Sequence, residues 1–527
     1  MKKITEQKVM QGAFILSVAA IIAKILSAVY RIPLQNLVGN TGFYVYQQIY
    51  PIYGIGMTFA LNGYPNFISK IIAEEPDQRK KLVLSQYSLM ILAVLSVTIF
   101  LVLVGGAHPI AQTMGDPQLA PMLRVVATMF LLMPLLATGR GYYQGIYDVL
   151  PTAKSQVVEQ VVRVSIIILV AILTVRQDWS VYKMGAYAMA SSTVAAVAAS
   201  WFFIPVIGKI VREGNHHFKW SVFRQLGKRF IVEGGLICLL SAMIILLQLV
   251  DSFTVKNSLV ASGMLPGTAK ALKGVYDRAQ PLVQVGTVIA TAFATTLLPS
   301  LTEALQKRDT GGFYRSATSL IRVAVAISTA ASVGMIALMP FINRLLFGSS
   351  TGSGALAIYN LSIILAAMIF VNNSVLQSMG RLKMTFWAIF AGLCVKVLCN
   401  GWAVRHWSID GASWVTVLSL AIIAFAMSWA LPARLLKRVY LENHFLLKLL
   451  VGNAIMFIVV QLMAGFLHLM IAGTGRGATL IITAVATLMG ALTWLSFVLI
   501  NRVFTLREWL TIPFGKKIIR TIQRMVK

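Results

Sequence analysis

The sequence predicts an all-α integral membrane protein of about fourteen transmembrane helices, built as two parallel six-helix lobes followed by two extra C-terminal helices. Composition is the first reason, because 58% of the residues are hydrophobic and 12% are charged, which is outside the range of a soluble globular domain. Long apolar windows recur from end to end. An internal repeat divides the first twelve windows into two sets with the same orientation.

Each predicted span is an apolar window of about 18 residues or more, which as a helix crosses about 30 Å of hydrocarbon. The windows cover residues 10–33, 43–66, 83–106, 121–138, 152–175, 182–206, 231–255, 279–301, 317–342, 355–378, 384–404, 411–433, 446–471 and 477–501. Placing the N-terminus in the cytoplasm puts most of the 46 Lys and Arg into the tails and the even-numbered loops, as the positive-inside rule requires. We therefore expect a multi-pass protein with both termini in the cytoplasm.

The repeat and the charge distribution suggest the domain boundaries. Spans one to six form an N-lobe, residues 1–208, and a basic stretch without a strong apolar run, residues 209–230, is the predicted cytoplasmic linker. Spans seven to twelve form a C-lobe, residues 231–440. Residues 441–502 hold the two spans outside the repeat, and residues 503–527 form a basic tail that can fold as a cytoplasmic amphipathic helix.

Each lobe carries one copy of a motif in which Tyr, Pro and Gly follow one another at equal spacing. The residues are Tyr46, Pro51 and Gly56 in the first copy, and Tyr276, Pro281 and Gly286 in the second. A proline inside a helix removes one backbone hydrogen bond, and broken helices at matching places in two halves of a transporter indicate its binding site. We therefore predict a break and a hinge at Pro51, Gly56, Pro281 and Gly286.

Two cations of the first span, Lys24 and Arg31, predict an anion site. Seven residues are nearly two helical turns, so both side chains leave the same face about 10 Å apart. Their neighbours one turn away include no acidic residue. A charge at the bilayer centre costs ~2.5–3.5 kcal/mol on the insertion scale, so such residues usually face a cavity or a partner. The alternative for Arg31 is snorkelling toward the headgroups.

A third cation, Arg278, directly follows Asp277. Adjacent residues on a helix point about a hundred degrees apart, so Asp277 does not neutralise Arg278 as a partner four residues away would. A guanidinium binds phosphate oxygens in a bidentate manner, which favours a substrate contact. The alternative is that Arg278 pairs with Asp251 at the end of the preceding span.

Other charges within spans have a supporting role in this interpretation. Glu159 and Arg163 are four apart on one predicted helix, where they can form a structural ion pair. Lys396 lies in the middle of the eleventh span, which contains no acidic residue.

The net charge of +29 does not indicate nucleic acid, because the basic residues are spread over short loops. Anionic lipid of the inner leaflet is the expected partner. The three cysteines lie within predicted spans and have neither metal-ligand nor disulfide spacing. We therefore expect no metal and no cofactor, and without a catalytic grouping in the outer loops we do not expect an enzyme.

Several stretches together resemble a known family. They are Ala23–Leu26 with a lysine inside the first span, Tyr276–Arg278 before the eighth span, and Leu297–Leu301 at its end. With fourteen spans in two parallel lobes, the chain resembles the multidrug/oligosaccharidyl-lipid/polysaccharide (MOP) exporter superfamily. Within it the sequence is similar to the MurJ-like lipid II flippases and to the branch that includes stage V sporulation protein B. The resemblance covers essentially the whole chain.

The resemblance implies a transporter of a bacterial plasma membrane that flips an undecaprenyl-pyrophosphate-linked cell-wall precursor, such as lipid II, from the inner to the outer leaflet by alternating access. The family's cavity cations carry over to Lys24, Arg278 and approximately Arg31. Its groove for the lipid tail corresponds to the two extra spans in residues 441–502. A monomer that meets cell-wall synthesis proteins is the implied assembly.

Two departures from the family pattern change what we expect. Arginines that some members carry after the proline of the second span are missing, since Pro51 is followed by Ile52. Some members bind sodium with a carboxylate in the eleventh span, where this chain has Lys396, so a fixed ammonium could replace the ion and sodium dependence is doubtful. Coupling to the membrane potential fits a cationic cavity, since each charge moved is worth ~2.3 kcal/mol per 100 mV.

Two alternatives in the same class are a flippase for another lipid-linked polysaccharide unit and a multidrug exporter. An exporter of cationic drugs should offer cavity carboxylates, whereas this predicted cavity is basic. Weaker alternatives from other classes are a membrane glycosyltransferase, which would need catalytic residues in the outer loops, and a scaffold for cell-wall synthesis that docks through the basic tail.

Overall fold

The computed structural model describes residues 2–214, 218–288, 301, 304–305, 307–471, 475–505 and 508–509, with only the backbone for residues 2–14 and 17. Within these ranges every regular element is a helix. Among the described residues, eleven helical stretches are long and apolar enough to cross a membrane. Two of them, Val18–Glu74 and Leu382–Trp429, each cover the whole of one predicted span and most of another, and most of the predicted span 279–301 lies outside the described residues. The all-helical membrane class is confirmed, and the count of fourteen stays a prediction.

The chain divides into two compact units. The first contains residues 1–281 with 396–412, and the second contains residues 282–395 with 413–527. The long helix α19 (Leu382–Trp429) contributes to both and is interrupted at Trp407 and Ser408, between the two spans predicted there. The lobe and linker boundaries proposed from the sequence are not tested by this division and stay predictions.

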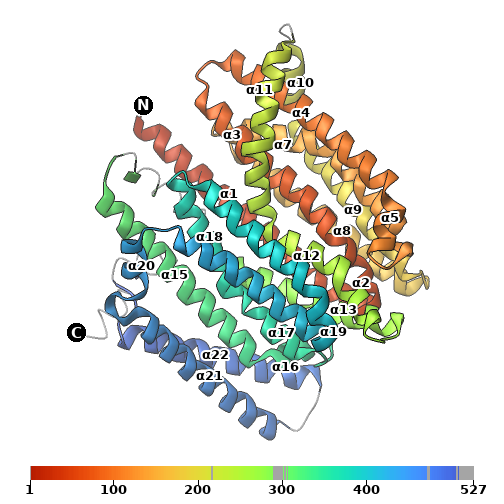
Figure 1. Ribbon diagram of the computed structural model, residues 1–527, viewed down its shortest axis with the longest axis vertical. Helices are drawn as coiled ribbons and strands as arrows, with labels where there is room; N and C mark the ends of the chain where they lie inside the picture. Colours follow the sequence, from red (N-terminus) through yellow and green to blue (C-terminus); the bar gives the residue numbers. More distant parts are fainter. Residues whose placement is uncertain are drawn as a thin grey trace. The chain divides into compact units, whose positions relative to one another are not determined.

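The first unit is built from the helices that precede Pro281 and a segment of α19 (Figure 1). In chain order they are α1 (Lys2–Val29), α2 (Arg31–Thr58), η1 (Phe59–Gly63), α3 (Tyr64–Glu74), α4 (Gln78–Gly105), α5 (Ala107–Thr113), η2 (Pro117–Leu119), α6 (Ala120–Ala127), η3 (Thr128–Leu132), α7 (Met133–Gly145), α8 (Leu150–Arg176), α9 (Val181–Ser200), η4 (Trp201–Phe203), α10 (Ile204–Glu213), α11 (Trp220–Arg229), η5 (Phe230–Gly234), α12 (Gly235–Ala261) and α13 (Pro266–Asp277). α2 is central, because α8, α9, α12 and α13 all pack against it.

The break in α2 lies at Gly39 and not at Pro51. Gly39 has a φ of 71°, in the left-handed region that glycine adopts without a Cβ clash. No other residue of α2 leaves helical dihedral angles, so the break predicted at Pro51 is wrong. In the second copy the interruption also precedes the proline, since α13 ends at Asp277, Arg278 is a turn residue, and residues 279–288 are helical.

The two motif glycines lie within helices and allow side chains of neighbouring helices to pack closely against them. A Cβ on Gly56 would lie 2.8 Å from the ring of Phe130, and one on Gly286 would lie 2.5 Å from Ile363. Both distances are far below a normal carbon–carbon contact of about 3.5–4.0 Å. The glycines therefore admit these neighbours, and their hinge function stays a prediction.

The first unit has a continuous apolar core with many aromatic residues. Phe43, Phe67, Phe130 and Phe203 are buried in it. Large apolar side chains also remain on the outer faces of the helices, with Leu101 61% exposed. On helices of this length and hydropathy, such faces suit lipid rather than water.

The second unit contains the remaining helices. They are α15 (Thr310–Ala337), α16 (Met339–Phe347), α17 (Ser353–Asn360), α18 (Ser362–Ser378), the rest of α19, α20 (Ala433–Tyr440), η6 (Glu442–His444), α21 (Phe445–Met470) and α22 (Arg476–Ile500). α21 and α22, the predicted extra pair, lie side by side (Figure 1), and they pack on α15 and α16. Most of the basic tail lies outside the described residues, so its amphipathic helix stays a prediction.

Arg322 of α15 holds the start of that tail. Its Nη2 donates to the carbonyl oxygens of Arg438 and Glu442, both at 2.7 Å, and its Nη1 lies 3.5 Å from a carboxylate oxygen of Glu508. The side chain is buried. Arg322 therefore clamps the segment after α20 and the segment after α22 against α15.

Candidate functional site

Tyrosines on α2 and the residues around its start form the first part of the candidate site. Tyr46, Tyr50 and Tyr53 are spaced four and three residues apart, so they share one helix face. Their ring centroids are 6.4 Å apart for the first pair and 5.6 Å for the second. We call the assembly around them the tyrosine–arginine cluster, which consists of Tyr30, Arg31, Tyr46, Tyr50, Tyr53 and Arg163.

Two guanidinium groups enter this cluster from different helices. Arg163 of α8 donates through Nη2 to the hydroxyls of Tyr46 at 2.8 Å and Tyr30 at 3.2 Å. Its guanidinium carbon lies 3.8 Å from the ring centroid of Tyr53. The guanidinium carbon of Arg31 lies 4.1 Å from the ring centroid of Tyr50. Such cation–π contacts are worth about 2 kcal/mol when the charge is desolvated.

Both arginines are buried without a carboxylate in contact. Arg31 is 1% exposed and Arg163 is 2% exposed, and within the described part of the chain neither forms a salt bridge. The Nε of Arg31 and the hydroxyl of Tyr53 also lack hydrogen-bond partners there. Burying an ion costs several kcal/mol, and tyrosine rings offset only part of that cost. The cluster is therefore suited to receive an anion.

The predicted ion pair between Glu159 and Arg163 is wrong. Glu159 instead accepts from Nη2 of Arg140, at 2.6 Å, across the contact between α7 and α8. Arg140 is fully buried and also donates to the Ser155 hydroxyl and to the Ala60 carbonyl, at 3.2 and 3.1 Å. Because Arg140 binds the only acidic side chain of α8, Arg163 contacts the tyrosines instead.

Arg278 lies where the end of α13 meets the break in α2. Its Nη2 donates to Asn40 Oδ1 at 2.6 Å, and the same oxygen accepts from Gln35 Nε2 at 2.9 Å. The approach is very close, because a Cβ on Gly274 would overlap the backbone carbonyl oxygen of Asn40. Gln35 is one turn after Arg31, so the structure brings Arg31 and Arg278 to the same end of α2.

Lys24 lies on α1 and is partly exposed. Tyr30, between α1 and α2, keeps helical dihedral angles, so the backbone runs almost continuously from Lys24 to Arg31. This nearly continuous helical backbone supports the prediction that the side chains of Lys24 and Arg31 leave the same face. A joint role in substrate binding stays a prediction.

Asp251 of α12 pairs with Lys396 and not with Arg278. The Lys396 Nζ lies 2.6 Å from Asp251 Oδ1, and Asn400 donates to the same oxygen at 3.0 Å. The hydroxyl of Tyr276 donates to Asp251 Oδ2 at 2.9 Å. The alternative of an Asp251–Arg278 pair is therefore wrong, and Lys396 finds on another helix the acid that its own span lacks.

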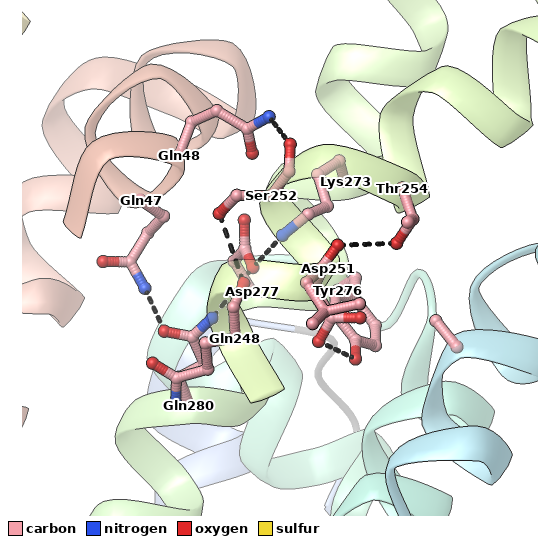
Figure 2. A network of polar contacts seen from close by, with 12 residues as sticks. Gln47, Gln48, Gln248, Asp251, Ser252, Thr254, Lys273, Tyr276, Asp277 and Gln280 are labelled. Atoms are coloured by element: carbon pink, nitrogen blue, oxygen red, sulfur yellow. Dashed lines mark hydrogen bonds and ion pairs between the residues drawn. The ribbon is translucent and has the colours of Figure 1, made fainter. Parts of the chain in front are cut away.

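Asp277 is paired on its own helix. Lys273, one turn earlier, lies 2.5 Å from Asp277 Oδ1, and Gln280 donates to the same oxygen at 3.1 Å. Gln280 in turn accepts from Gln47 of α2 at 2.8 Å. Figure 2 shows these groups as part of one polar network that connects α2, α12 and α13. The pairing agrees with the prediction that Asp277 does not neutralise Arg278.

These pairings decide the charge of the interior of the first unit. Three buried cations have one carboxylate each, in the pairs Arg140–Glu159, Lys273–Asp277 and Lys396–Asp251. The charge of Asp277 also reaches Arg31 through space, but that carboxylate is already bound to Lys273. Arg31 and Arg163 thus leave the tyrosine–arginine cluster positive.

A second polar group, the 113–116 contact, ties the segment after α5 to α12 and α13. Asp116 lies 2.8 Å from Lys270 Nζ and accepts from Tyr182 at 2.8 Å, while Asn257 donates to the Thr113 carbonyl at 2.8 Å. Burial opposes the charge on Lys270, but Asp116 and Tyr182 outweigh it and raise the pKa of Lys270. Its ammonium therefore stays charged at neutral pH.

Sequence reasoning missed several of these contacts. Lys273 precedes Asp277 by four residues, a spacing that signals an ion pair on a helix, yet Lys273 is not among the residues predicted to form the site. Nothing in the sequence connects Arg140 to Glu159, because they lie on different helices. The role of Arg163 follows only once that pair is known.

Residues 9–305 match the family model described as polysaccharide biosynthesis protein. The chain is 33% identical over 522 residues to the uncharacterized membrane protein YabM of Bacillus subtilis, covering 98% of this chain and 96% of that protein. It is 24% identical over 448 residues to the lipid II flippase MurJ of the same organism, covering 78% of this chain and 80% of MurJ. A solved structure of lipid II flippase MurJ superposes with a TM-score of 0.69 at 14% identity, covering 93% of this chain and 99% of that one, which confirms the predicted exporter fold.

Proposed function

Because this chain belongs to the polysaccharide biosynthesis protein family, we propose that it is a transporter that flips a lipid-linked, negatively charged cell-wall precursor across the membrane by alternating access. Its relative MurJ bears the name lipid II flippase, and lipid II is the substrate that we favour. The same substrate class includes other sugars on an undecaprenyl pyrophosphate. The activity is transport and not catalysis.

The observation that carries this proposal is the buried positive charge of the tyrosine–arginine cluster. Arg31 and Arg163 are nearly inaccessible and have no salt-bridge partner in the described part of the chain. A pyrophosphate offers oxygens that a guanidinium binds in a bidentate manner. Arg278 near the same end of α2, and Lys24 on α1, supply further positive charge for the headgroup.

The same observation argues against export of cationic drugs. A cation entering the first unit would meet two guanidinium groups, and the three buried carboxylates named above are each already bound to a Lys or an Arg. Like charges at short range cost more in a low-dielectric interior than in water. An anionic substrate is the better match.

The energy source follows from the same charges in this proposal. The ammonium of Lys396 lies on Asp251, which supports the expectation that no sodium ion is needed there. An empty site with unneutralised guanidinium groups moves positive charge when the transporter returns, and the membrane potential acts on that movement with ~2.3 kcal/mol per charge per 100 mV.

The decisive experiment measures which leaflet holds lipid II in cells depleted of this protein and of redundant flippases. We expect lipid II to accumulate in the inner leaflet and to reappear outside when the chain is restored. If lipid II reaches the outer leaflet equally with and without the protein, the lipid II assignment is wrong. Accumulation of another lipid-linked sugar in the same cells would identify that sugar as the substrate.

Variants of the cluster test the binding site itself. Arg163→Gln should reduce flipping at least tenfold while the protein remains folded in the membrane, because it removes one of the two unneutralised charges. Arg278→Ala should also fail to complement flippase-depleted cells. The matched control is Arg176→Gln at the exposed end of the same helix α8, which should flip normally. Full activity of Arg163→Gln would remove the cluster from the substrate path.

A further inference from the structure

Two buried carboxylates of the first unit differ in how completely they are bound. Asp251 and Asp277 are both 0% exposed. Asp251 receives donors on both oxygens, from Lys396 and Asn400 on Oδ1 and from Tyr276 on Oδ2. Both carboxylate oxygens of Asp251 are therefore bound by hydrogen-bond donors.

Asp277 receives donors on one oxygen only. Lys273 and Gln280 both bind Oδ1, at 2.5 and 3.1 Å. Its Oδ2 is buried and has no hydrogen-bond partner among the described residues. A buried acceptor left without a donor costs about 1–3 kcal/mol, and more when it carries charge. The geometry therefore leaves one lone carboxylate oxygen inside the protein.

The network around this oxygen has a surplus of acceptors. The side-chain oxygens of Gln47, Gln48 and Gln248 are also buried, and within the described residues they too lack donors. Exchanging the oxygen and nitrogen of these amides would not supply the missing donors. The nitrogen of Gln47 already donates to Gln280, and that of Gln48 to the Ser252 carbonyl. Figure 2 shows these side chains together with Asp277 in one network. What the network lacks is a donor.

A metal ion is a poor candidate for that donor. No group of three or more His, Cys, Asp or Glu that could hold a metal is found among the described residues. An added cation on Asp277 would also lie close to the Lys273 ammonium, which is 2.5 Å from the other oxygen of the same carboxylate. A proton needs no set of coordinating ligands, since it bonds directly to Oδ2 and turns that oxygen into a donor.

We propose that Asp277 is a proton-binding carboxyl, loaded at Oδ2 from water. The step forms one O–H bond, uses a proton from hydronium and breaks no covalent bond in the protein. The ion pair with Lys273 then becomes a hydrogen bond between an ammonium and a neutral carboxyl. Uptake therefore loosens the last turn of α13, directly before Arg278.

The charged and titratable groups that face Asp277 come from every helix around it. Lys273 belongs to its own helix, Asp251 to α12, and Arg31 and Tyr44 to α2. Lys396 of α19 interacts electrostatically with Asp251 and also with Lys273. The cations hold Asp277 ionised at high pH, whereas Asp251 and the unmatched amide oxygens favour the proton. The protonation state of Asp277 is therefore set by the balance between these cations and these acceptors.

Infrared difference spectra of the full chain in lipid nanodiscs test the assignment without any substrate. As the pH is lowered but kept above the range in which exposed Asp and Glu become protonated, about pH 4, a band of a protonated carboxyl should appear in the wild type and in Asp251→Asn. The band should be absent in Asp277→Asn over the same pH range. Lys273→Gln should move the midpoint of the band about 1–3 pH units higher, because it removes the opposite charge on the same carboxylate. This variant keeps the test open if Asp251→Asn fails to fold.

Three results would overturn the proposal. The band could remain in Asp277→Asn, it could disappear in a folded Asp251→Asn, or it could be missing at every pH at which the wild type stays folded. Titration with sodium chloride at constant ionic strength provides a further arm. A band that sodium ions suppress competitively would assign the site to a metal cation and contradict proton binding.

Discussion

At the scale of single residues, the buried pair Arg140–Glu159 has a large predicted effect on stability. Arg140→Gln leaves the Glu159 carboxylate buried without its cation, and breaking a buried pair in this way costs about 3–5 kcal/mol. We expect a clearly lower thermal unfolding midpoint for the purified protein in detergent. The double variant Arg140→Gln with Glu159→Gln should recover most of the loss, and an Arg140→Gln protein as stable as the wild type would show that the pair is not essential.

The same residues show what sequence can and cannot predict about a site. The sequence identified Arg31, Arg278 and Arg163 as charges that need an explanation, because cations are rare within apolar spans. It assigned Glu159 to Arg163 from their spacing on one helix. The actual partner, Arg140, is chosen by the packing of α7 on α8, which no local pattern encodes.

At the scale of elements, the contact between α13 and α2 depends on Gly274. A methyl group there would overlap the Asn40 carbonyl, so Gly274→Ala should push α13 away from α2 and loosen the hydrogen bond from Arg278 to Asn40. We expect reduced flipping and a lower unfolding midpoint. Gly267→Ala in the same helix is the matched control, because nothing lies within 4 Å of its Cβ position. Equal behaviour of the two variants would contradict this account.

Helices were easier to predict than their interruptions. Hydropathy located the long helices, and the gap between two predicted spans coincides with the break of α19 at Trp407 and Ser408. Proline was a misleading signal, because α2 accommodates Pro51 while it breaks at Gly39. A helix tolerates one lost hydrogen bond more readily than a residue with a left-handed φ, which ends the regular pattern outright.

At the scale of the whole molecule, alternating access in the proposed function requires the 113–116 contact to open. Cysteines at positions 113 and 257, in a chain without Cys238, Cys394 and Cys399, should be joined by a short thiol-specific crosslinker. We expect flipping to stop in the linked protein and to resume after the linker is cleaved. Single-cysteine variants treated with the same reagent are the control, and continued flipping by the linked protein would show that this contact does not open during transport.

The 113–116 contact should also depend on pH in a defined direction. Lys270 has a raised pKa in the folded protein, so its ion pair with Asp116 contributes fully at neutral pH and is lost only as the pH rises through that raised value. Asp116→Asn should therefore speed thiol labelling of position 257 at neutral pH. In the wild type the same increase should appear only in alkali, above the ordinary range of a lysine.

The ion pair between Lys396 and Asp251 also bears on how the chain is made. Asp251 leaves the ribosome before Lys396, so the carboxylate is already in the membrane when α19 reaches the insertion machinery. A lysine at mid-span disfavours integration by ~2.5–3.5 kcal/mol, and a waiting carboxylate offsets that penalty. Replacing Asp251 should consequently lower the yield of protein with α19 integrated in the bilayer, measured by membrane fractionation, while the fraction that does integrate stays folded.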